Sequence, residues 1–304
     1  MKPWLLKLHR WLALVFALPL IVVIATGLIL SVEPWLVTAS ITPGTLTEEK
    51  VQALLGKHDP NGQARALVHR SYDHTLTLGA GRGGGTVVDT LSGERTAPSA
   101  IAQLLGTTRG LHERLLLDAG WLVNASTAAM LIMIVLGLLM GWPRLANSFA
   151  GWHKMTAWGL LPLIILSPLT GLLMAAGITL TTLPAAAPAM PPLKLGEAVA
   201  IVGRAHDLSS LLFLRPQGGR LVARLAEGGE YRLYAVTREG LSALPRNWPR
   251  LWHEGNFAGA WSAAMNLILS LALSLLLVTG FWIWLRRQVR RARRTPSVPR
   301  MSAA

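Results

Sequence analysis

Four long apolar runs constrain this chain more than any other feature of its sequence. Each is long enough to cross a lipid bilayer as an α-helix, which takes about 20 residues. Only 14% of the 304 residues are charged, against about 25% in ordinary soluble domains. We therefore expect an α-helical integral membrane protein, not a soluble or disordered chain. The expected spans are residues 11–32, 121–142, 158–180 and 260–285.

The basic residues predict how these spans are oriented. The net charge is +14, from 29 lysines and arginines against 15 aspartates and glutamates. Three short segments at span ends carry basic residues and no acidic ones: Lys2, Lys7, Arg10, Arg144, Lys154, Arg286, Arg287, Arg290, Arg291, Arg293, Arg294 and Arg300. The positive-inside rule places these segments, and so both termini, on the cytoplasmic side of a bacterial inner membrane. The charge excess then reflects topology and contact with lipid, and no nucleic-acid partner is expected.

The two long segments between spans have the mixed composition of soluble domains. In the first, we expect a helix and two strands at residues 47–57, 65–78 and 84–89, with a glycine-rich hairpin loop between the strands. In the second, we expect a helix and three strands at residues 195–205, 211–216, 220–226 and 231–237. The sequence therefore predicts two small α+β modules on the periplasmic side.

The two halves of the chain repeat each other. His9 precedes Thr26-Gly27 by 17 residues (26−9), and His153 precedes Thr170-Gly171 by the same 17 (170−153). Two further histidines, His112 and His253, follow these at 103 (112−9) and 100 residues (253−153). We expect two parallel span–module–span repeats, related by an axis along the membrane normal and forming a four-helix transmembrane bundle.

This repeat gives the expected domain boundaries. They are a cytoplasmic N-terminus with the first span (1–33), a periplasmic module (34–107), the second span with a periplasmic extension (108–144), a cytoplasmic connection with the third span (145–180), a second module (181–250), the fourth span with its extension (251–285), and a basic cytoplasmic tail (286–304).

Four of the eight histidines are candidate cofactor ligands. His9 and His153 are expected near the cytoplasmic face, and His112 and His253 near the outer face. Ionisable side chains at such positions are uncommon and usually functional. Pairs of neutral imidazoles on facing helices suit the ligation of haem iron. We predict two bis-histidine b-type haems, one held by His9 with His153 and the other by His112 with His253.

Neighbouring residues add detail to this prediction. Alanines at Ala13 and Ala157, four residues after a ligand, and at Ala119 and Ala260, seven after, would leave room for a macrocycle on the same helix face. Candidate partners of haem propionates are Arg10, Lys154, Arg114 and Arg250.

Other chemistry has little support in the sequence. The chain has no cysteine, so thiolate metal sites and disulfides are excluded. His58 and His206 each end a predicted helix, and a metal role for this pair stays a lesser alternative. His69 and His74 have no counterpart in the second module and are expected at the surface. No nucleotide-binding or hydrolase motif is present.

Several short motifs together resemble those of the PepSY-associated transmembrane family. They are Leu8-His9-Arg10-Trp11-Leu12, Thr26-Gly27-Leu28, the segment from Gly137 to Trp142-Pro143-Arg144, Trp152-His153-Lys154 with Thr170-Gly171, and Thr279-Gly280 before Trp282 and Trp284. The two modules between spans resemble PepSY-type segments. Members of this family include iron-regulated inner-membrane proteins and haem-containing ferric-siderophore reductases.

The resemblance implies transfer of electrons across the membrane to a periplasmic Fe(III) chelate such as a ferric siderophore. The cytoplasmic segments are too short for a flavin or nicotinamide domain, so the electron donor would be a quinol or a separate reductase. The alternative is a non-catalytic scaffold or assembly factor whose modules bind a periplasmic protein. A metal transporter is a weaker alternative, because no carboxylate is expected within the bilayer. The sequence leaves the oligomeric state open, a homodimer included.

Overall fold

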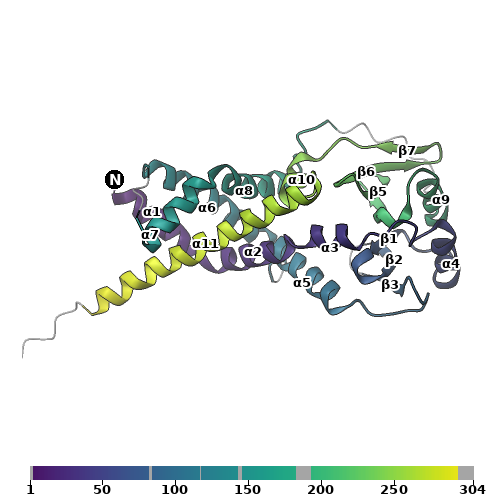
Figure 1. Cartoon of the computed structure of the whole chain (residues 1–304), viewed down its shortest axis with the longest axis horizontal. Coiled ribbons are helices and arrows are strands. Elements are labelled where there is room, and N and C mark those ends of the chain that lie inside the picture. Colours follow the sequence, from purple (N-terminus) through teal and green to yellow (C-terminus); the bar gives the residue numbers. More distant parts are fainter. Residues whose placement is uncertain (1–2, 82–83, 117, 143–145, 183–192, 294–304) are drawn as a thin grey trace, which may run out of the picture.

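The computed structural model describes residues 3–81, 84–116, 118–142, 146–182 and 193–293. The molecule is elongated, with a bundle of helices at one end and a domain built on a β-sheet at the other (Figure 1). We call the latter the sheet domain (residues 42–98 and 193–247). The basic residues Lys2, Arg144, Arg294 and Arg300, which contribute to the predicted topology, lie outside the described residues.

Three helices of the described chain are long and apolar enough to cross a membrane, or four if one bent pair is a single span. The three are the segment 17–40, which contains α2 (Ala17–Leu30) and α3 (Glu33–Ser40), α6 (Gly120–Leu139) and α11 (Gly259–Ala292). The chain therefore has the several apolar helices of a membrane protein. A further helix, α1 (Pro3–Val15), precedes α2.

The bent pair begins before the expected third span, residues 158–180, and only its second helix lies within that range. It comprises α7 (Phe149–Gly159) and α8 (Leu161–Ala175), whose axes differ in direction by 70°. Pro162 stands in the first turn of α8, where its missing N–H costs no helical hydrogen bond. The same ring would disrupt a helix that continued through it, which explains the break.

The bundle helices share one apolar core. It joins side chains of α2, α6, α8 and α11: Leu20, Ile24, Met130, Met133, Ile164, Leu269, Ala272 and Leu273. Residues from both halves of the chain therefore pack together in the interior of the bundle.

Two short helices lie between the bundle and the sheet domain. They are α5 (Ala100–Arg114) and α10 (Trp248–Glu254). Each ends at a residue with positive φ, Leu115 at 53° and Gly255 at 67°, so neither continues into the following span. The expected placement of Ala119 and Ala260 on the same helix faces as His112 and His253 is wrong, because the helix ends between them.

The two modules form a single antiparallel sheet of seven strands in the order β3-β2-β1-β4-β5-β6-β7. The strands are β1 (Ala66–Arg70), β2 (Thr75–Gly81), β3 (Gly84–Asp89), β4 (Leu211–Gln217), β5 (Arg220–Glu227), β6 (Glu230–Thr237) and β7 (Gly240–Ala243). One strand was expected over 65–78, but a 3₁₀ turn (Ser71–Asp73) divides it into β1 and β2.

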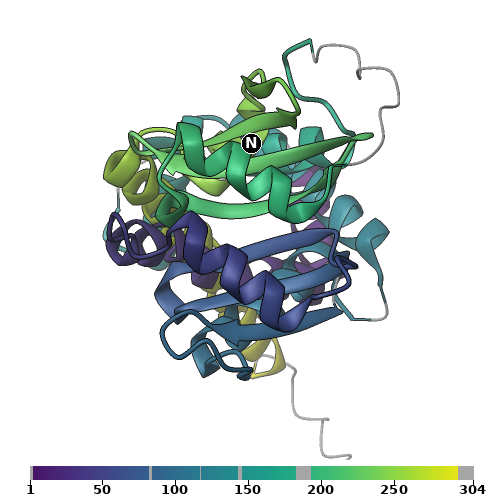
Figure 2. The ribbon, with the colours of Figure 1, turned by 90° about the vertical axis from the view of Figure 1, so that its right-hand side faces the viewer.

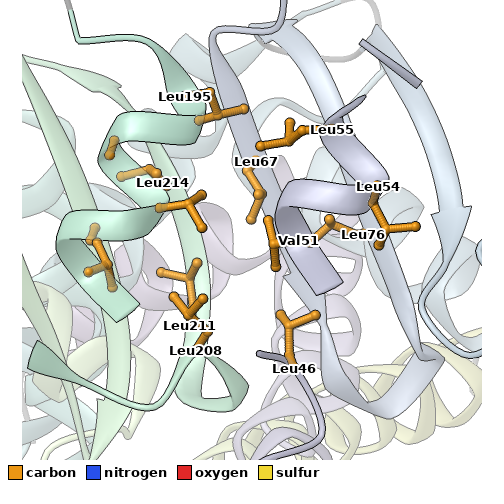
Figure 3. Close-up of a cluster of buried hydrophobic side chains, with 14 of the residues drawn as sticks. Leu46, Val51, Leu54, Leu55, Leu67, Leu76, Leu195, Leu208, Leu211 and Leu214 are labelled. Carbon is orange, nitrogen blue, oxygen red and sulfur yellow. The ribbon is translucent and has the colours of Figure 1, made fainter. Parts of the chain in front are cut away.

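The modules join because β1 pairs with β4, with Leu67 opposite Leu214. Two helices, α4 (Glu48–His58) and α9 (Leu195–Ala205), cover the sheet face that points away from the bundle (Figure 2). Leucines and valines of both modules interdigitate beneath them (Figure 3). Either module alone would expose a strand edge and half of this core, which is the physical reason for the shared sheet.

Candidate functional site: four histidines on Thr-Gly pairs

The imidazole of His112, on α5, packs against α2 of the bundle. Its Nδ1 lies 3.1 Å from the Val23 carbonyl oxygen and 3.1 Å from the Thr26 hydroxyl oxygen. A Cβ built on Gly27 would lie 3.2 Å from the His112 Cε1 atom. The ring therefore lies directly on the glycine, and its Nδ1 edge faces α2.

The imidazole of His253, on α10, has the same surroundings in the second half of the chain. Its Nδ1 lies 3.2 Å from the Ser167 carbonyl oxygen and 3.2 Å from the Thr170 hydroxyl oxygen, both on α8. A Cβ on Gly171 would lie 3.2 Å from its Cε1 atom.

The other two candidate ligands lie at the far end of the bundle. His153, on α7, places Nδ1 2.9 Å from the Thr279 hydroxyl oxygen of α11. A Cβ on Gly280 would lie 3.4 Å from its ring. His9, on α1, places Nδ1 3.0 Å from the Met133 carbonyl oxygen of α6.

Three of the four histidines thus face a helix segment with one register. In these segments a backbone carbonyl stands at position n, a threonine at n+3 and a glycine at n+4. Position n is Val23 for His112, Ser167 for His253 and Leu276 for His153. We call this arrangement the Thr-Gly clamp. The clamp of His9 differs, because Met133 is followed at n+3 by Leu136, not threonine.

The hydrogen bonds of the threonines fix which imidazole nitrogen carries the proton. Each hydroxyl donates to a carbonyl of its own helix: Thr26 to Val22, Thr170 to Leu166 and Thr279 to Leu275, at 2.6–2.7 Å. Its oxygen can therefore only accept from Nδ1–H, as the carbonyl does. Each of these imidazoles therefore donates through Nδ1, and its Nε2 lone pair remains available to bind a metal.

The four rings form two pairs. We call His112 and His253 the sheet-side pair, since α5 and α10 adjoin the sheet domain, and His9 and His153 the distal pair. The sheet-side rings have centroids 6.0 Å apart and are tilted by 48°. The distal histidines lie on α1 and α7, at the end of the bundle away from the sheet domain (Figure 1). In the described part of the chain no three His, Asp or Glu side chains gather into a metal-binding group.

An ionic cluster lies beside the sheet-side pair. Glu254 follows His253 and accepts hydrogen bonds from Arg224 at 2.6 Å and Arg250 at 3.0 Å. Burial alone would raise the pKa of the Glu254 carboxyl, but the two guanidiniums outweigh it and hold the pKa below its ordinary value. Arg109 pairs with Glu33. Arg109 and Arg250 each precede a sheet-side histidine by three residues.

Arg109 was not among the residues that the sequence suggested as partners of haem propionates. Its spacing to His112 (112−109) nevertheless equals that of Arg250 to His253 (253−250). Arg114, which was favoured instead, pairs at 3.8 Å with the exposed Asp118. Arg10 and Lys154 lie on α1 and α7, each next to a distal histidine.

The remaining histidines have local partners within the sheet domain. The ring of His58 bonds the Gly93 carbonyl at 2.9 Å, and His206 pairs with Glu227. His69 is buried, in contrast to the expected surface position, with Nδ1 3.0 Å from the Leu211 carbonyl; burial lowers its pKa. His74 stands in a left-handed turn with φ of 48°.

Apolar spans, a sheet domain and paired histidines at two levels define an integral membrane protein with candidate cofactor ligands inside its helical bundle. A family model described as the PepSY-associated TM region matches residues 6–287. The chain therefore belongs to this family, in agreement with the resemblance of its short motifs. No curated protein matches the chain.

Proposed function

We propose that this protein is a haem b electron-transfer protein of the bacterial inner membrane that reduces a periplasmic Fe(III) chelate, such as a ferric siderophore. The observation that carries this proposal is the recurrence of one imidazole environment, with a threonine hydroxyl at three of the four histidines and a carbonyl at the fourth as well. A histidine that only anchored a helix would not need its Nδ1 directed onto a carbonyl in all four cases.

The sheet-side pair supports this proposal, because its two imidazoles lie next to each other and each already has its Nδ1 atom against a carbonyl of α2 or α8. The centroids of His112 and His253 are 6.0 Å apart. Neutral imidazole with no thiolate nearby is a donor set that suits haem iron.

The protein's own contribution is to prepare the ligands. When bound, haem b supplies one-electron transfer between its ferrous and ferric states. The carbonyl and threonine acceptors hold each Nδ1–H and orient the ring, which makes Nε2 a better donor. Glycine at n+4 lets the ring approach the neighbouring helix, because a Cβ at Gly27 or Gly171 would come within 3.2 Å of the ring.

The path of the electron follows from the two levels of histidines. His9 with His153 would receive it from a quinol or a cytoplasmic reductase, and His112 with His253 would deliver it near the sheet domain. One electron converts the chelated Fe(III) to Fe(II), for which hard oxygen ligands have less affinity, and iron is released. This assigns the chain a ferric-chelate reductase activity.

The architecture proposed for this function is a four-helix bundle of two parallel repeats. In support, α1 contacts α6 as α7 contacts α11, and α2 contacts α5 as α8 contacts α10. Equivalent residues of the two halves would then meet across an axis along the membrane normal.

The proposed orientation places both termini in the cytoplasm and the sheet domain in the periplasm. Its basis is the basic character of the segments at the distal end. Reporter fusions after residues 95 and 230 should therefore report a periplasmic location, and fusions after 147 and 295 a cytoplasmic one. A cytoplasmic result at 230 would contradict the parallel repeat.

Electron transfer to an Fe(III) chelate tests the function directly. Purified protein loaded with haem and reduced under nitrogen should be reoxidised by ferric chelates, with Fe(II) trapped by ferrozine in equal amount. Variants His112→Ala and His253→Ala should transfer far more slowly. A colourless protein from cells with ample haem would instead favour the scaffold alternative.

A further inference from the structure

A small hollow lies between the sheet and the helix that carries His253. Its walls come from β5, β6, the segment 244–247 and α10. Four guanidiniums line it, those of Arg224, Arg232, Arg246 and Arg250, with one carboxylate, that of Glu230. Such a concentration of arginine is typical of sites that recognise carboxylate or phosphate.

The positive charges of this hollow exceed the negative ones. Glu230 pairs with Arg246 at 2.8 Å and with Arg232 at 3.3 Å. Glu254 pairs with Arg224 and Arg250. Four guanidiniums less two carboxylates leave an excess of two positive charges.

Two polar atoms of residues that line the hollow have no hydrogen-bond partner among the described residues. They are the Nε of Arg224 and the hydroxyl oxygen of Tyr231, and both are buried. Leaving such groups unpaired costs about 1–3 kcal/mol each. Arg224 Nε can only donate and a tyrosine hydroxyl can donate, so an acceptor that reached either atom would satisfy it.

We propose that this hollow, the arginine pocket, binds carboxylate groups of an anionic ligand. The inference rests on the proposed function, and it names the substrate class as carboxylate-bearing Fe(III) chelates. Arg250 lines the pocket and precedes His253 by three residues, about one helical turn. A chelate bound here would lie close to the exit of the electron path.

The same chemistry has a second source, the propionates of a haem held by the sheet-side pair. An inert probe separates the two sources. Ga(III) citrate carries carboxylates like an Fe(III) chelate but takes no electron, so its binding, measured by titration calorimetry on the full chain in detergent, does not depend on redox activity.

Charge variants of the pocket should change the affinity for Ga(III) citrate in opposite directions, whereas damage to the fold would only weaken it. Arg246→Gln should weaken Ga(III) citrate binding by about 5–10-fold, the effect of one charge-assisted contact. Glu230→Gln, which removes the opposing carboxylate, should tighten it several-fold. Arg238→Gln, on the β6–β7 turn outside the pocket, is the matched control and should change nothing.

A comparison of wild type with His253→Ala then identifies the source of the carboxylates, because this variant should lack the sheet-side haem. Binding to both wild type and His253→Ala supports the chelate as the ligand. Binding only to His253→Ala supports propionates as the occupant of the wild-type pocket. Absence of binding in both proteins, or affinity that ignores Arg246→Gln and Glu230→Gln, would overturn the proposal. Haem-dependent reduction of chelates could still occur in that case, so the proposed function would survive.

Discussion

The sheet-side and distal pairs share one backbone arrangement and differ in a single side-chain acceptor. Both sheet-side imidazoles direct Nδ1 to a carbonyl and to a threonine hydroxyl. In the distal pair His153 has its threonine, but His9 has the Met133 carbonyl alone. The carbonyl is therefore the common element, and the threonine is an addition that one ligand of the four lacks.

The glycines at n+4 also differ between His9 and the other three histidines. A Cβ on Gly27 or Gly171 would press on a sheet-side ring at 3.2 Å, and on Gly280 at 3.4 Å on His153. A Cβ on Gly137, which follows Leu136 in the clamp of His9, would meet no atom within 4 Å. The His9 ring thus lies less tightly on its helix, and the distal pair should be the more adaptable of the two.

Removing a ligand should have the largest effect and should separate the pairs. His112→Ala and His253→Ala should lose or convert only the sheet-side haem, so that bound haem falls by about half. His9→Ala and His153→Ala should affect only the distal one. Double variants within a pair should be little worse than single ones, because both ligands act on one iron. Optical spectra and haem content measure this.

If all four single variants keep full haem content and an unchanged low-spin spectrum, these histidines are not the ligands. If each loses everything, haem binding is coupled to folding, and the independence of the two pairs is contradicted.

Filling the space under a ring should have the next largest effect. Gly171→Ala would bring a methyl group to 3.2 Å from His253, tighter than ordinary van der Waals contact, and should weaken or lose the sheet-side haem. Gly137→Ala is the matched control at the equivalent position of the distal pair, where nothing lies within 4 Å. Equal haem loss in the two variants would contradict the difference between the pairs.

Changing the threonine acceptor should have the smallest effect. Thr26→Val removes one acceptor of His112 and should raise the reduction potential of the sheet-side haem by about 20–50 mV, since Nδ1–H bonds favour the ferric state. Thr26→Ser should restore it. Leu136→Thr should lower the distal potential by a similar amount, because it supplies the missing acceptor.

A control is available for this redox series. Thr127 is buried on α6, and its hydroxyl donates to the Val123 carbonyl of its own helix. Thr127→Val should leave both potentials unchanged in a spectroelectrochemical titration. A shift as large as that of Thr26→Val would mean that the potentials respond to general packing rather than to the clamp.

The sequence contained the residues of this site, but it did not show which Thr-Gly pair contacts which histidine. Thr26-Gly27 and Thr170-Gly171 are visible as repeat markers 17 residues after His9 and His153. In the structure they contact His112 and His253 instead. Spacing within one helix cannot show which neighbouring helix approaches it, because that depends on packing between distant segments.

The fold, too, was predicted only in part. The apolar runs identified the apolar helices, since length and hydropathy suffice for that, but not their breaks. The first run, residues 11–32, covers the end of α1 and all of α2, and the bend between α7 and α8 falls inside the third. The union of the two modules through β1 and β4 was not predicted, because the strands are about 140 residues apart and either could have remained an edge. The break between α5 and α6 was missed because it depends on the positive φ of Leu115, a residue type that gives no turn signal.

Haem stoichiometry tests the central claim most directly. Full-length protein, purified from cells supplied with haem, should be red, with the reduced spectrum of a low-spin b-type cytochrome. A pyridine haemochrome assay against amino-acid analysis should give about two haems per chain, one for each pair of histidines. A folded, monodisperse protein that contains no haem would contradict the account.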